Sequence, residues 1–177
     1  MKKFKSILII ILLFIIIYFL QCNFFSWFNI AGIMPNLYVV LVLFVGLFIG
    51  KKIGVLSGII IGLILDALFG RDVGITSILL GAVGLAAEFL DRRYSKDSRI
   101  TIIIMALVST IFFEVAKYAI CYFMHNVELE IMEFIRILII ENIFNSLLII
   151  IFYAGMKRLG YYLEEGFKTK KFATRYF

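Results

Sequence analysis

The stretch GVLSGIIIGLILDALFGRDVG, residues 54–74, combines an apolar run with regularly spaced glycines and a single carboxylate within the run. Gly54, Gly58 and Gly62 recur at every fourth position, and Asp66 takes the next position of the series. Small residues at this spacing let a neighbouring helix approach closely, which favours helix association in lipid. A charged side chain in a membrane is costly and usually has a polar partner. The stretch therefore predicts a transmembrane helix with one tightly packed face and a polar contact near its end.

The four-residue spacing continues on both sides of this helix. Four more glycines belong to the series, namely Gly46, Gly50, Gly70 and Gly74. Lys51 and Lys52 interrupt the apolar run, so the series spans two helices. Two uses of the glycine face remain open. It packs against another helix of this chain, or it contacts a helix of another protein, including a second copy in a homodimer.

The composition predicts an all-α integral membrane protein. Hydrophobic residues make up 63% of the chain, against about 45–50% in soluble domains, and the mean hydropathy is +1.06. The chain reads as one polytopic domain, residues 1–177, with a tail at 156–177. The apolar runs predict six transmembrane helices, at residues 6–24, 36–50, 53–70, 74–91, 100–124 and 134–155. The second run is shorter than the roughly 20 residues that a crossing needs, so a re-entrant segment is its alternative.

The basic residues indicate the orientation of the chain. With alternating loops, 15 of the 18 Lys and Arg residues fall on the side of the N-terminus. Cytoplasmic loops carry this excess in membrane proteins, so both termini are expected in the cytoplasm. The net charge of +6 is then a topology signal and a contact for lipid headgroups, and the sequence gives no reason to expect nucleic acid.

No catalytic or cofactor motif is present in the sequence. It contains no GxxxxGK[ST], HExxH, GxSxG or CxxC pattern, and its one histidine is His125. We therefore expect no enzyme activity, no metal and no cofactor.

Several polar residues fall inside the predicted fifth and sixth spans, namely Glu114, Lys117, Glu141, Asn142 and Asn145. Charged groups within a membrane usually face one another or a cavity. We expect Lys117 to pair with Glu114 or Glu141, with Asp66 at the edge of the same cluster. Asp66 itself lies roughly 6 Å below the outer end of its helix, where it reaches the interface, Arg71, a neighbouring helix or an outer partner. The cluster either holds the helices of the bundle together or serves as a transport site.

Residues 34–84 resemble the central signature of the MreD family, the bacterial rod shape-determining membrane proteins. The features that match are Pro35 before the second span, the turn GKKIG at 50–54, the segment SGIIIGLILD at 57–66, and the pair Gly70 and Gly74. The resemblance covers roughly a third of the chain. The remainder agrees in hydropathy and topology.

The resemblance implies a non-enzymatic scaffold of the cell-elongation machinery in the bacterial cytoplasmic membrane. Such proteins are thought to bind MreC and to act beside MreB, RodA and a class B penicillin-binding transpeptidase in side-wall peptidoglycan synthesis. It gives candidate roles to Pro35, Gly58, Gly62, Asp66 and Gly74.

An alternative is a substrate-binding subunit of an energy-coupling-factor vitamin transporter, which is similar in architecture as a small six-helix bundle. Those subunits usually carry small residues on their first span, where the coupling protein docks. Here that span reads ILIIILLFIIIYFL, without Ala or Gly. This departure disfavours the transporter.

Overall fold

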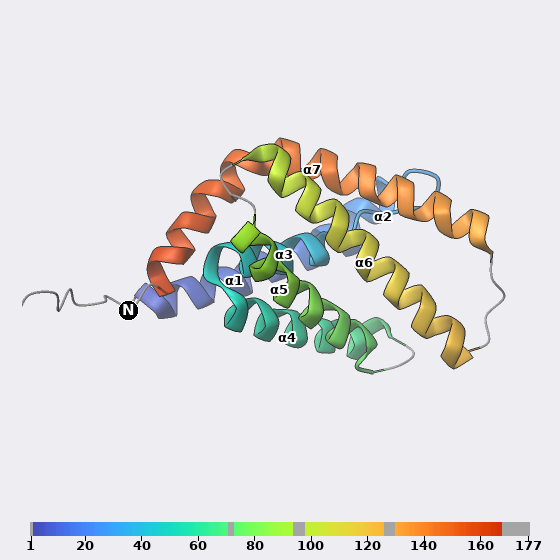
Figure 1. Ribbon diagram of the computed structural model, residues 1–177, viewed down its shortest axis with the longest axis horizontal. Helices are drawn as coiled ribbons and strands as arrows, with labels where there is room; N and C mark the ends of the chain where they lie inside the picture. The colour runs from blue at the N-terminus through green and yellow to red at the C-terminus, as the bar shows by residue number, and fades with distance from the viewer. Residues whose placement is uncertain (1, 71–72, 94–97, 126–129, 168–177) are drawn as a thin grey trace, which may run out of the picture.

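The computed structural model describes residues 2–70, 73–93, 98–125 and 130–167, and these residues form helices joined by short connections (Figure 1). The elements are α1 (Lys2–Phe19), the π-helix η1 (Leu20–Phe24), α2 (Phe25–Trp27), α3 (Leu37–Ile49), α4 (Lys51–Phe69), α5 (Ile75–Arg93), α6 (Arg99–His125) and α7 (Ile131–Phe167). The all-α prediction is confirmed, and each of the six expected spans coincides with a helix. The last helix runs on to Phe167, so the first part of the expected tail is helical.

Four helical segments of the described chain are long and apolar enough to cross a membrane, namely Lys3–Trp27, Lys51–Phe69, Arg99–Met124 and Ile131–Phe167. Two other apolar helices are shorter, Leu37–Ile49 and Ile75–Ala87. The 13 residues of α3 rise about 20 Å, which is less than a hydrocarbon core of about 30 Å.

The short helix α3 lies at the centre of the protein (Figure 1). Every residue from 39 to 48 is buried, and α3 packs against α1, α4, α5, α6 and α7. A helix that is apolar on all sides is typical of such a buried position. Its shortness is therefore accommodated by protein on every side.

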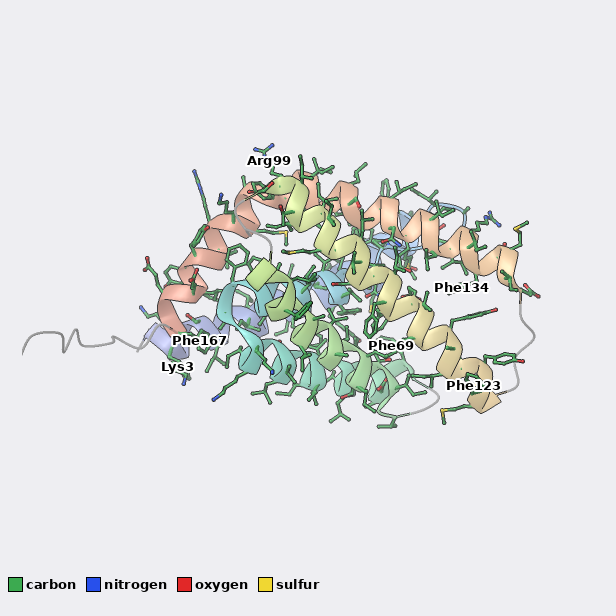
Figure 2. All side chains as sticks on the ribbon, viewed as in Figure 1. Lys3, Phe69, Arg99, Phe123, Phe134 and Phe167 are labelled. Atoms are coloured by element: carbon green, nitrogen blue, oxygen red, sulfur yellow. The ribbon has the colours of Figure 1, made fainter. Side chains whose placement is uncertain are left out.

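The first helix is the one most exposed to lipid. Within the segment Lys3–Trp27, only 6% of the most apolar 18-residue stretch is buried in the protein. Phe4, Leu8 and Phe19 are all more than half exposed. At the opposite end of the chain, α7 turns back toward the start of α1 (Figures 1 and 2). The ammonium of Lys3 lies 6.0 Å from the ring centroid of Phe167. The two ends of the described chain therefore meet at one end of the bundle.

The glycine face of α4 packs against α5, which runs antiparallel to it. A methyl group at Gly58 would lie within 3.0 Å of the Leu80 backbone, and one at Gly62 within 3.0 Å of Ser77. Nearer the other end, Gly54 lies against Gly84 and against Gly46 of α3. The four-residue spacing on α3 and α4 thus brings three helices of this one chain together.

A single residue, Gly50, links α3 to α4. Its φ of +110° lies in a region that side chains with a Cβ avoid, so glycine suits this sharp reversal. The reversal aligns α3 beside α4, and Gly46 and Gly54 can then meet across it.

Candidate functional site

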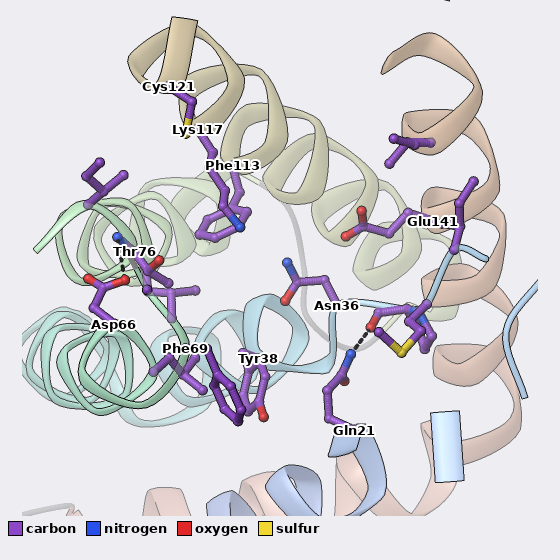
Figure 3. A pocket seen from close by; sticks show the side chains of 18 of the residues that line it. Gln21, Asn36, Tyr38, Asp66, Phe69, Thr76, Phe113, Lys117, Cys121 and Glu141 are labelled. Atoms are coloured by element: carbon purple, nitrogen blue, oxygen red, sulfur yellow. Dashed lines mark hydrogen bonds between the residues drawn. The ribbon is translucent and has the colours of Figure 1, made fainter. Parts of the chain in front are cut away.

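Asp66 is buried at the end of α4 and binds the start of α5. Its carboxylate accepts hydrogen bonds from the backbone N–H groups of Gly74 at 2.8 Å, Thr76 at 3.3 Å and Ser77 at 3.2 Å. Figure 3 shows the bond from Thr76. Asp66 is only 3% exposed. A carboxylate from one helix therefore caps the next helix.

The physical reason is the chemistry of a helix N-terminus. The first N–H groups of a helix have no partner within it, and the helix dipole favours a negative charge there. In lipid these N–H groups cannot turn to water, so each needs an internal acceptor. Of the partners considered for Asp66 from the sequence, the structure provides the neighbouring helix, while Arg71 lies outside the described residues.

The glycines around Asp66 let this cap form. Gly62 brings the Ser77 backbone close to α4, and the N–H of Gly70 donates to the carbonyl oxygen of Asp66 at 2.9 Å. Gly74 has a φ of +111°, which turns the chain so that its N–H faces the carboxylate. The glycine and aspartate positions that carried the family resemblance thus build one helical hairpin.

A second capped helix start lies beside the first. Pro35 is fully buried, and its carbonyl oxygen accepts a hydrogen bond from the amide of Gln21. The next residue, Asn36, is the N-cap of α3, where its side chain accepts from the Val39 N–H at 3.4 Å. Asn36 also donates to Glu114 of α6 at 3.2 Å. The start of α3 is thereby tied to η1 and α6.

Asn145 of α7 connects this cap to two helices. Its amide oxygen accepts from the Asn36 N–H at 3.0 Å, and its amide nitrogen donates to the Thr110 hydroxyl of α6 at 3.1 Å. Asn145 is 1% exposed and Thr110 is fully buried. Glu114 and Asn145, expected from the sequence in an intramembrane polar cluster, therefore hold α3 in place.

Replacing Asn145 with leucine should lower the free energy of unfolding by about 1–3 kcal/mol, because the half-buried Asn36 N–H loses its acceptor and the buried Thr110 hydroxyl loses its donor. Thermal unfolding of the purified protein in detergent measures the change. Thr110→Val removes the hydroxyl together with one of these two bonds, so it should cost less. Equal stability of Asn145→Leu and the unaltered protein would contradict this role.

A cavity of about 760 Å³ opens at the end of the bundle where α3 and α5 begin (Figure 3). Asp66, Lys117 and Glu141 all line it, as the sequence led us to expect for one cluster. Polar neighbours in its wall are Gln21, Asn36, Tyr38, Thr76 and Cys121. Its volume is within the range of small-molecule sites, about 300–1,000 Å³.

Lys117 does not form the ion pair predicted from the sequence. Among the described residues it has no salt bridge with Glu114 or Glu141, and its ammonium lies instead 5.7 Å from the Phe113 ring centroid. One turn of α6 separates Lys117 from Glu114, whose carboxylate is bonded to Asn36. One of the two carboxylates predicted as partners of Lys117, that of Glu114, is therefore bonded to the cap of α3 instead.

Glu141 and Asn142 are both buried on α7. Asn142 donates to the carbonyl oxygen of Leu138 at 2.8 Å, within its own helix. Glu141 lies beside Asn36 and Glu114, and its Oε1 atom has no hydrogen-bond partner in the described structure. Glu141 thus lines the cavity without a salt bridge.

A second cavity of about 400 Å³ lies between α6 and α7, which diverge toward this end of the bundle (Figure 1). Glu114, Lys117, Glu130 and Glu133 line it, and Tyr118 stacks on Phe134 with ring centroids 4.2 Å apart. Lys117, Cys121 and Ile137 line both cavities. These three residues therefore form a wall that the two cavities share.

Several residues of this region were not predicted from the sequence, namely Gln21, Asn36, Tyr38, Thr76 and Thr110. A signal was available for Asn36, because asparagine before an apolar helical run is a preferred N-cap. The others are uncharged polar residues in or beside apolar runs, with no spacing that marks them. Within the described part of the chain, no group of His, Cys, Asp and Glu residues could hold a metal ion.

Comparison with known proteins gives a family for the chain. Residues 1–159 match the family described as rod shape-determining protein MreD. No curated protein and no solved structure matches the chain. The match extends well beyond the hairpin of α4 and α5, and it includes the cap of α3 and both cavities. The chain therefore belongs to the MreD family of rod shape-determining membrane proteins.

Proposed function

We propose that this protein is a multi-pass, non-enzymatic scaffold of the cell-elongation machinery in the bacterial cytoplasmic membrane, and that it acts by binding an MreC-like protein. The observation that carries the proposal is the family match over residues 1–159. RodA, a class B penicillin-binding transpeptidase and MreB are then the further partners of the same machinery. Their role is side-wall peptidoglycan synthesis.

The polar chemistry of the buried site supports a scaffold over an enzyme. The carboxylate of Asp66 accepts three backbone N–H groups, and Asn36 and Asn145 are engaged in the cap of α3. Groups held in this way stabilise the helix arrangement. Asp66, the one carboxylate among these groups, is therefore not free to serve as a base or a nucleophile.

The direction of the helices supports six crossings with both termini in the cytoplasm. The cavity is lined by the first residues of α3 and α5 and by the last residues of α4, so these helices alternate in direction. With α1, α6 and α7 alternating as well, the basic N-terminus and the end of α7 lie on the same side. Basic residues favour the cytoplasm for that side.

The test is a pull-down of the tagged protein from its native host in a mild detergent, with the bound proteins identified by mass spectrometry. We expect an MreC-like protein to co-purify, and depletion of the chain to convert rod-shaped cells to round ones. A tagged membrane protein of similar size from the same host is the control. Recovery of paired ATPases with a coupling membrane subunit, and no MreC-like protein, would contradict the proposal and indicate a transporter.

A further inference from the structure

The large cavity places an acid and a base around one space without pairing them. Lys117 of α6 and Glu141 of α7 both line it (Figure 3), yet they form no salt bridge with each other. In a membrane, charged residues usually pair directly unless they face a cavity or its contents. The arrangement leaves room between the two groups for a molecule that carries both charges.

Other atoms in the cavity wall also lack partners. In the described structure the Oε1 atoms of Gln21 and Glu141 and the hydroxyl of Tyr38 are buried without a hydrogen bond. The amide nitrogen of Gln21 already donates to Pro35, so its oxygen is left as an acceptor. The two Oε1 atoms therefore need a hydrogen-bond donor, because buried polar groups usually have a hydrogen-bond partner.

The position of the cavity narrows the class of molecule. It opens at the ends of the helices, beside a second cavity between α6 and α7, and Lys117 lines both cavities. A helix end of a membrane protein is where phospholipid headgroups are met, and these carry a phosphate. Apolar side chains, including Leu65, Phe69 and Phe113, complete the wall and suit a larger apolar portion.

We propose that this cavity binds a primary-ammonium zwitterion of the phosphoethanolamine type. The ammonium group donates to the Glu141 carboxyl and, once the Gln21 side chain rotates toward the cavity, to its amide oxygen. The phosphate meets the ammonium of Lys117. The molecule is either a phosphatidylethanolamine headgroup, which enters between α6 and α7, or free phosphoethanolamine. This binding site is independent of the scaffold proposal, because it requires no protein partner.

The lipid source is tested by native mass spectrometry of the purified full-length protein, reconstituted with phosphatidylethanolamine or phosphatidylglycerol. We expect retention of phosphatidylethanolamine in preference to phosphatidylglycerol. Glu141→Gln and Lys117→Gln should each reduce that retention about tenfold, since a hydrogen bond to a charged group is worth at least this factor. Lys52→Gln and Glu165→Gln, which alter exposed residues at the other end of the bundle, should change nothing.

The soluble source is tested by titration calorimetry with O-phosphoethanolamine in detergent. Binding that falls about tenfold in both cavity variants would assign the site to the free molecule. Phosphocholine is the matched control, because its quaternary ammonium has no N–H to donate and should bind more weakly. Lys117 is exposed, so Lys117→Gln carries the test if Glu141→Gln does not fold.

The proposal is overturned if neither probe binds in preference to its control. It is also overturned if Lys117→Gln leaves binding unchanged, or if Lys52→Gln and Glu165→Gln reduce binding as much as the cavity variants do.

Discussion

Asp66→Ala is expected to lower the free energy of unfolding by about 2–4 kcal/mol, because three backbone N–H groups at the start of α5 would lose their acceptor. Of the three donor residues, Ser77 is buried, so its N–H has the least access to water as a replacement acceptor. The helix dipole also loses its complementary charge. The hairpin of α4 and α5 should therefore be the part of the molecule that fails first.

A series of substitutions at Asp66 distinguishes loss of the helix cap from loss of a negative charge alone. Asp66→Asn keeps one oxygen that can accept, so it should cost less than alanine. Glu165→Ala removes an exposed carboxylate and should lie within about 0.5 kcal/mol of the unaltered protein. The measurement is the fraction that remains monodisperse on size-exclusion chromatography after heating in detergent. Unaltered stability of Asp66→Ala would contradict the cap.

The same variants distinguish the two roles that the sequence left open for Asp66. If the residue served an outer partner, Asp66→Asn would weaken complex formation while the chain folded and inserted normally. If it caps α5, loss of the complex should follow loss of folded protein in proportion. Quantifying the MreC-like partner per folded chain in a pull-down decides between them.

The helices were predictable from the sequence because their signal is local. Runs of apolar residues separated by charges placed six spans on the observed helices, and the largest difference in bounds is at the end of α7. The uniform apolarity of α3 is typical of its buried position. The extension of α7 to Phe167 was not predicted. Lys157 and Arg158 end the hydropathic run, but lysine and arginine favour a helix as well as apolar residues do.

The contacts of the site were harder to predict because they depend on the rotation of each helix and on backbone atoms. The donors to Asp66 are backbone N–H groups, which carry no mark in a sequence. For Lys117 the sequence offered two carboxylates at suitable depth, and the prediction of an ion pair was wrong. The cap of α3 competes for Glu114, and that competition arises only once the helices are assembled.

Gly58→Ala is expected to destabilise the protein by about 1–3 kcal/mol, although alanine is the better helix former. The added methyl group would lie within 3.0 Å of three backbone atoms at Leu80 and Gly81. A flexible side chain could move aside from such a contact, but a helix backbone cannot without shifting α5. That shift would also pull the start of α5 away from Asp66, so the cap and the glycine contact should weaken together.

The matched control is Gly155→Ala in α7, where an added methyl group meets nothing within 4 Å. There the same substitution should be neutral or should stabilise the protein by up to about 1 kcal/mol, because glycine is the poorer helix former. Thermal unfolding of both variants in the same detergent gives the comparison. Opposite signs would show that α4 needs glycine to contact α5. Equal effects at the two positions would mean that helix propensity alone accounts for the change and that the close contact of α4 with α5 is not required.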